Sequence, residues 1–170
     1  MRVLGIDPGS RVTGFGVVGA EGGVVTVIAS GTVAPPAGAG FAARLRAVHE
    51  GIRAVIARHE PDEAAIEDAF LAKNVKTVAQ ISQVRGVLLL ALEMAGLPFT
   101  EYAPREVKLA VSGNGNASKE QVERMVARLL ALPSRSGSLD ESDALAVALC
   151  HAHRAGRAGR AQTIGGGRRA

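Results

Sequence analysis

The sequence predicts an α/β fold in which a five-stranded mixed sheet is flanked by helices on both faces. Two observations lead to this class. Three apolar segments near the amino terminus follow one another through short Gly-containing turns, which is typical of hairpin-linked strands. Beyond them, segments with helical apolar spacing alternate with two more short apolar segments, which is typical of a sheet covered by helices.

The amino-terminal residues predict the first three strands. Residues 2–7, 12–20 and 24–33 are apolar, and they are separated by Pro8-Gly9-Ser10 and Glu21-Gly22-Gly23. Both separating segments favour hairpin-type connections, so we expect neighbouring antiparallel strands.

The middle of the chain predicts a fourth strand between two helices. Apolar residues recur at spacings of three and four over residues 41–56, which indicates an amphipathic helix. Residues 63–67 form a short strand with an acid at its end. Residues 78–94 are apolar on nearly all sides, so we expect this helix to be buried on more than one side, within the domain or against a second copy.

The last part of the folded chain predicts a fifth strand and three helices. The strand covers residues 98–102, and a short helix covers residues 105–111. Capping boxes at Ser118–Gln121 and Ser138–Glu141 predict where the next two helices begin. By analogy, this order of elements is that of a ribonuclease H-like fold.

Length and composition predict one domain, residues 1–155, and a disordered basic tail, residues 156–170. The chain has 170 residues, of which 47% are apolar, enough for a substantial core. Residues 151–170 hold five of the 20 basic residues and no acid, so the net charge of +4 comes from this end. Nucleic acid is a reasonable partner, although charge alone does not establish one.

Cysteine usage and hydropathy predict a cytoplasmic protein without a membrane partner. The single cysteine, Cys150, rules out an internal disulfide and lies in an apolar helical pattern, so we interpret it as a core residue. No run has the length of a membrane span, and the chain starts with a strand pattern instead of a signal peptide.

Four carboxylates lie where the predicted fold could bring them together. Asp7 ends the first strand and Glu67 ends the fourth, although Asp68 competes for this second position. Asp140 and Asp143 are three residues apart at the start of the last helix, so they project about 60° apart on one face. Oxygen ligands from separate elements suit a hard cation such as Mg²⁺. The helix dipole also stabilises acids in the first turn, and this effect by itself would explain Asp140.

Lysine, glycine and histidine residues near these elements can also be interpreted. Lys119 is the first residue of a predicted helix, where a cation opposes the dipole, which favours phosphate binding over a solvated side chain. Glycine weakens a strand, so Gly14 and Gly16 need a reason to be there. They favour either close approach of a DNA backbone or a bend or bulge in the strand. His151 and His153 are expected near the end of the last helix, where they would cap its dipole.

Several motifs together resemble the RuvC family of bacterial Holliday junction resolvases. They are "GIDPGS..TGFGVV", "IEDAFLAKN", "RGVLLLALE", "YAPREVK" and "DESDALAVALCHAH", and the resemblance covers residues 1 to about 154. It implies a ribonuclease H-like homodimer that cuts four-way junction DNA by paired nicks with divalent metal. It also implies RuvA and RuvB, the branch-migration proteins, as partners.

The resemblance assigns roles to individual residues. The family's catalytic acids and metal ligands fall on Asp7, Glu67, Asp140 and Asp143, with two Mg²⁺ ions expected and Mn²⁺ as a substitute. Some members carry histidine at the position of Asp140. The family's DNA-binding residues fall on Phe70, Lys108 and Lys119.

Three other classes of protein share part of these features. The segment Gly5–Ser10 also resembles the first phosphate loop of actin-like and sugar-kinase-like ATPases, but these need a second related domain, and no second copy of the loop occurs here. A family of small RNA-processing nucleases begins with a similar strand but lacks the paired acids of "DESDALAVA". A non-catalytic junction-binding protein would not need the intact acids.

Overall fold

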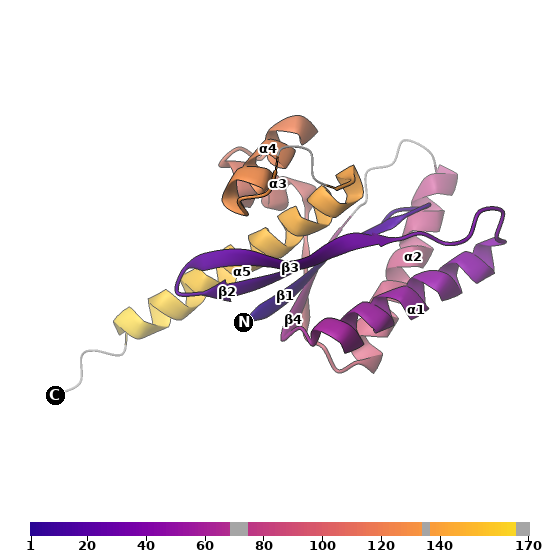
Figure 1. Ribbon diagram of the computed structural model, residues 1–170, viewed down its shortest axis with the longest axis horizontal. Helices are drawn as coiled ribbons and strands as arrows, with labels where there is room; N and C mark the ends of the chain where they lie inside the picture. Colours follow the sequence, from indigo (N-terminus) through magenta and orange to yellow (C-terminus); the bar gives the residue numbers. More distant parts are fainter. Residues whose placement is uncertain (69–74, 134–136, 166–170) are drawn as a thin grey trace.

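The computed structural model describes residues 1–68, 75–133 and 137–165, with side chains as far as Gly156. Figure 1 shows a twisted sheet with helices on both sides. The elements in chain order are β1 (Arg2–Asp7), β2 (Thr13–Glu21), β3 (Val24–Val33), α1 (Phe41–His59), β4 (Glu63–Glu67), α2 (Val75–Met94), β5 (Phe99–Tyr102), α3 (Pro104–Ser112), α4 (Lys119–Leu129) and α5 (Leu139–Gly165).

The five strands form one mixed sheet in the order β3-β2-β1-β4-β5. β1, β2 and β3 pair antiparallel through the predicted hairpins, whereas β4 pairs parallel with both β1 and β5. A register shift between Val17 and Val18 marks a β-bulge in the β2–β3 ladder. The predicted five-stranded mixed sheet is therefore confirmed.

Each face of the sheet has its own apolar core. Val3 and Ala65 belong to the core under α5, while Leu4, Ile6 and Ile66 belong to the core under α1 and α2. Successive strand residues point to opposite faces, so one residue of each pair enters each core. In Figure 1, α5 crosses one face of the sheet and α1 and α2 lie on the other, with α3 and α4 beside the first half of α5.

Helix α2 is buried on one side only within the described chain. Leu88 and Leu92 are fully buried in the core, whereas Leu90 is 54% exposed and Met94 62% exposed. By length and composition α2 is also the one described helix that could cross a membrane, a test that the core helix of a globular protein passes as well. The sequence analysis predicted that this helix is buried on more than one side. The described chain buries one side, so the second side would be buried only against another molecule.

The helix starts follow the capping signals, but the last helix is longer than predicted. Ser118 and Gln121 form the reciprocal capping box of α4, and the Glu141 backbone N–H donates to Ser138 Oγ at the start of α5. α5 then continues to Gly165, so residues 156–165 are helical where the sequence analysis predicted a disordered tail. Alanine and arginine are good helix formers, and a buried first half removes the cost of nucleating the extension.

Candidate functional site

Parallel pairing of β1 and β4 places Asp7 beside Glu67. Ile6 pairs with Ile66 in this ladder, and both isoleucines point into the α1 and α2 core. The next residue of each strand, Asp7 and Glu67, therefore points to the α5 face at the carboxyl end of the sheet. Ligand sites of open α/β sheets form at this end of parallel strands.

Helix α5 begins over the same edge and supplies the two other carboxylates. Asp140 lies in its first turn and Asp143 three residues further. A Cβ on Gly14 would overlap the carbonyl oxygen of Asp140, and one on Gly16 would lie 2.7 Å from Leu145 Cδ2. These glycines therefore admit α5 against β2, a reason that the sequence analysis did not include. The register shift between Val17 and Val18 follows Gly16 directly, as the bulge interpretation allows. Close approach of DNA stays a prediction.

The four carboxylates form one electrostatic cluster. Burial, followed by the charges of Glu67, Asp143 and Asp140, raises the pKa of Asp7 from 3.8 to about 8. Burial and the charge of Asp143 likewise raise the pKa of Glu67. A cation bound among partly buried acids that repel one another would stabilise their ionised forms.

Lys119 supplies one cation to the cluster. Its Nζ lies 2.8 Å from Asp143 Oδ2, and this hydrogen bond is the main cause that raises the pKa of Lys119. Lys108 also lies near enough for its charge to favour ionised Glu67. The structure thus places Lys119 in contact with the acids, and Lys108 near enough for its charge to act on one of them. Phe70, the third predicted DNA-binding residue, lies outside the described residues.

Arg85 of α2 distinguishes Glu67 from its competitor Asp68. Arg85 Nε lies 3.7 Å from Asp68 Oδ1, and Arg85 is also paired with Glu101 of β5. The Asp68 backbone N–H donates to the carbonyl oxygen of Tyr102 at 2.8 Å. Asp68 is therefore held on the α2 side, while Glu67 joins the cluster. This role of Arg85 was missed, because an arginine in an apolar helix has no sequence signal for its partner.

The donor set fits a hard divalent cation, although no ligand cage is fully formed. Within the described ranges, no group of three or more His, Cys, Asp or Glu side chains is arranged to hold a metal ion. The donors are nevertheless carboxylate oxygens, the type that Mg²⁺ and Mn²⁺ prefer. The ammonium of Lys119 already approaches Asp143 as a cation would. The residues therefore fit a cation after local side-chain adjustment.

His151 is a buried structural residue and does not cap a helix end. Its Nδ1 lies 2.9 Å from Tyr102 Oη, and its Nε2 lies 2.6 Å from Glu63 Oε2. The predicted capping role was wrong because α5 continues well past this position. The neighbouring Cys150 is fully buried, as predicted, and burial raises the pKa of its thiol to about 11.

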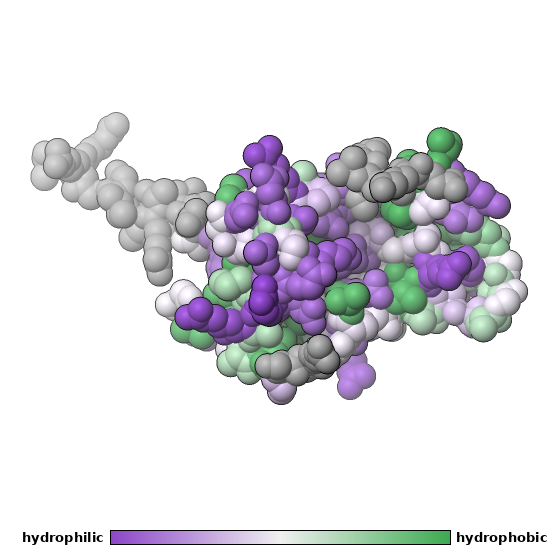
Figure 2. All heavy atoms as spheres, turned by 90° about the horizontal axis from the view of Figure 1, so that it is seen from above, coloured by the Kyte–Doolittle hydropathy of each residue, from purple (hydrophilic) through white to green (hydrophobic). Residues whose placement is uncertain are grey.

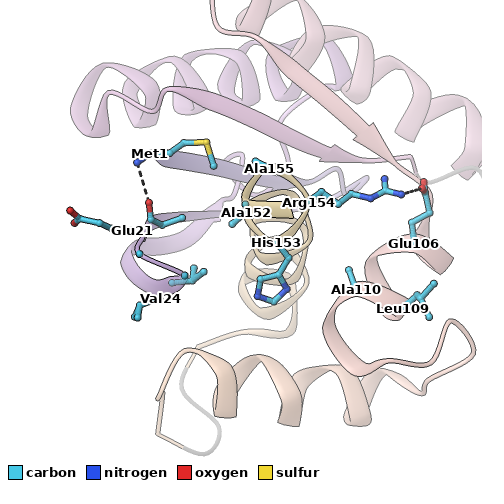
Figure 3. Close-up of a pocket in the computed structure, with 15 residues that line it drawn as sticks. Met1, Glu21, Val24, Glu106, Leu109, Ala110, Ala152, His153, Arg154 and Ala155 are labelled. Carbon is cyan, nitrogen blue, oxygen red and sulfur yellow. Dashed lines mark hydrogen bonds and ion pairs between the residues drawn. The ribbon is translucent and has the colours of Figure 1, made fainter. Parts of the chain in front are cut away.

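A large hollow lies beside the middle of α5, whereas Asp140 and Asp143 lie at the start of this helix. It has a volume of about 1070 Å³ and lies between the β2–β3 turn, α3 and residues 152–156 of α5. Figure 3 shows Arg154 paired with Glu106 at its rim, an ion pair of 3.0 Å, and Met1 on its sheet side. None of the four clustered carboxylates lines this hollow. The carboxylate cluster and this hollow are therefore separate.

The face that carries α3 and α4 is strongly hydrophilic. Figure 2 views the molecule from above, and hydrophilic side chains gather there over α3 and α4. Lys108 belongs to α3 and Lys119 begins α4. The two predicted DNA-binding lysines of the described chain therefore come from the helices of this hydrophilic face.

Comparisons with known proteins agree on one family. A family model for crossover junction endodeoxyribonuclease RuvC matches residues 3–151. The RuvC of Chloroflexus aggregans is 47% identical over 155 residues, 91% of this chain and 94% of that protein. The RuvC of Pelobacter propionicus is 46% identical over 153 residues, 90% of this chain and 86% of that protein. The structure of T. thermophilus RuvC in complex with Holliday junction substrate matches with a TM-score of 0.86 and 32% identity, covering 93% of this chain and 96% of that one.

Proposed function

The chain belongs to the crossover junction endodeoxyribonuclease RuvC family, and we propose on this premise that it resolves four-way (Holliday) DNA junctions during recombination and repair. The observation that carries the proposal is the convergence of Asp7, Glu67, Asp140 and Asp143 from two strands and one helix. Family membership leaves no place for the ATPase and RNA-processing alternatives. A non-catalytic junction binder would have no use for a cluster of mutually repelling acids.

We propose that these four carboxylates hold divalent metal, with two Mg²⁺ ions as the preferred occupants and Mn²⁺ as a substitute. Bound divalent ions would supply Lewis-acid activation of the phosphate and a water of lowered pKa. The proposal is supported by the raised pKa values of Asp7 and Glu67, because cation binding replaces the proton that Asp7 retains up to about pH 8.

The chain's own side chains position the substrate. Lys119 contacts the carboxylate cluster and the charge of Lys108 reaches Glu67, so we propose that both ammonium groups bind phosphate oxygens of the DNA. Asp7 and Glu67 come from rigid, fully paired strands, which keeps their carboxylates in fixed relative positions. Phe70 follows the Glu67 strand by three residues, and we propose that its ring stacks on an unpaired base near the crossover.

We further propose that the active form is a two-fold homodimer that packs through α2. Leu90 and Met94 are exposed on this helix while its opposite side is buried in the core. A two-fold dimer presents two identical acid sites, which suits the approximate two-fold symmetry of a four-way junction. Family resemblance suggests RuvA and RuvB as the proteins that act with it.

A cleavage assay on synthetic DNA tests the proposal. The protein is incubated with a four-way junction or with a duplex of the same arm sequence, in Mg²⁺, in Mn²⁺ or in EDTA. We expect paired nicks in two symmetric strands of the junction with either metal, little cutting of duplex, and none in EDTA. Metal-independent cutting, or equal cutting of both DNAs, would refute it.

A further inference from the structure

Lys119 contacts the acid cluster from another element of the fold. It is the first residue of α4, whereas its partner Asp143 lies in α5 and the other acids lie in α5 or on the sheet. Its Nζ lies 2.8 Å from Asp143 Oδ2, and its positive charge lowers the pKa of Asp7 and of Glu67. One ammonium therefore acts on carboxylates from three different elements.

The local structure of α4 does not explain this placement. A lysine in the first turn opposes the helix dipole. The side chains of its two sequence neighbours contact each other, because the Ser118 hydroxyl donates to Glu120. The Lys119 side chain is 66% exposed, so it could extend into solvent, yet it lies 2.8 Å from Asp143 Oδ2. Attraction to the acids outweighs solvation and the dipole at this position.

A single ammonium cannot satisfy four carboxylates. It balances one charge, whereas the four carboxylates come from β1, β4 and α5. A divalent cation would bring more charge to the same oxygens, so the ammonium and the cation compete for Asp143.

We propose that Lys119 is the internal counter-cation of the acid site, and that divalent metal displaces it from Asp143 and frees its ammonium for a DNA phosphate. The proposal rests on the proposed function of these acids in metal-dependent cleavage. It adds that metal binding and junction binding are linked through one side chain. Such linkage is reciprocal, so metal should strengthen junction binding by the factor by which the junction strengthens metal binding.

The first test measures Mg²⁺ binding to the DNA-free protein by isothermal titration calorimetry. Removing the competing ammonium in Lys119→Gln should tighten Mg²⁺ binding about fivefold, the range expected for one exposed ion pair. Arg124→Gln removes a charge of the same sign from an exposed position on the same helix, where Arg124 Nε donates to the Glu120 carbonyl oxygen, and should leave Mg²⁺ affinity nearly unchanged. Lys119→Arg keeps the charge and should resemble wild type.

The second test measures junction affinity by fluorescence anisotropy in EDTA and in Ca²⁺. Wild-type protein should gain more affinity from the metal than Lys119→Gln does, while Arg124→Gln should gain as much as wild type. Melting curves confirm that each variant is folded. Unchanged or weaker Mg²⁺ binding by Lys119→Gln would overturn the proposal. An equal metal-dependent gain in junction affinity for wild type and Lys119→Gln would also overturn it. A wild-type protein that cleaves junctions normally would show that the proposed function survives such a failure.

Discussion

Replacing Asp7 by asparagine should stabilise the metal-free protein at pH 8 while it removes a carboxylate from the site. Asparagine keeps the shape of the side chain and removes the charge that Glu67, Asp143 and Asp140 repel. The pKa of Asp7 rises from 3.8 to about 8 on folding. Between these two values the folded chain holds a proton that the unfolded chain has lost, so the free energy of unfolding falls as the pH rises.

The magnitude follows from the size of this pKa change. Each pKa unit is worth about 1.4 kcal/mol, which places the upper limit near 6 kcal/mol. Asp7 is partly exposed and shares its repulsion with other acids, so we expect about 2–3 kcal/mol for the single substitution at pH 8. For a chain of this size that corresponds to a rise in melting temperature of about 5–10 °C.

Thermal melts in EDTA across pH 5 to pH 8.5 provide the assay. Wild-type protein should lose stability as the pH rises over this range, and Asp7→Asn should lose less. Mg²⁺ should restore the stability of the wild-type protein at pH 8, because it binds only the folded state. Glu93→Gln, an exposed acid on α2, is the control and should follow wild type. Equal or lower stability of Asp7→Asn at pH 8 would refute the reasoning that the acids repel one another.

Three further predictions concern packing, assembly and DNA contact. Gly14→Ala should destabilise the fold by about 3 kcal/mol or more, because its Cβ meets the Asp140 backbone, while Gly19→Ala on the same strand, with its nearest neighbours at 3.5 Å, should cost far less in a denaturant titration. Leu90→Glu should shift the sedimentation coefficient to that of a monomer without lowering the melting temperature of the protein. A dimer that persists in this variant would exclude this face of α2 as the dimer interface. Phe70→Ala should slow junction cleavage at unchanged stability, and F70Y should restore it, whereas a lowered melting temperature would assign Phe70 to the core.

The fold could be predicted largely from local patterns. Hairpin turns, capping boxes and apolar periodicity lie within short segments, so the order of strands and helices was correct. The end of α5 was predicted too early in the chain. A Gly- and Arg-rich composition indicates disorder on average, but a helix whose first half is buried can extend through such a segment. The packing role of Gly14 and Gly16 was missed for a related reason. Their neighbour is α5, which lies more than a hundred residues further along the chain.

The candidate site was predictable as a set of acids but not as an arrangement. Carboxylates at strand ends and at a helix start stand out because their positions within elements are fixed by the sequence. Which of two adjacent acids joins the cluster depends on Arg85, and where the Lys119 ammonium goes depends on how α4 packs beside α5. Such partner choices across elements leave no local signal.

The most direct test of the catalytic assignment measures binding and cleavage of one synthetic four-way junction by single-acid variants. Asp7→Asn, Glu67→Gln and Asp143→Asn should each lower the single-turnover nicking rate about a thousandfold or more in Mg²⁺, since each removes a proposed metal ligand. Their junction affinity should stay within about threefold of wild type, because phosphate contacts come mainly from basic side chains. Near-wild-type nicking by Asp7→Asn would contradict the assignment of this cluster as the catalytic centre.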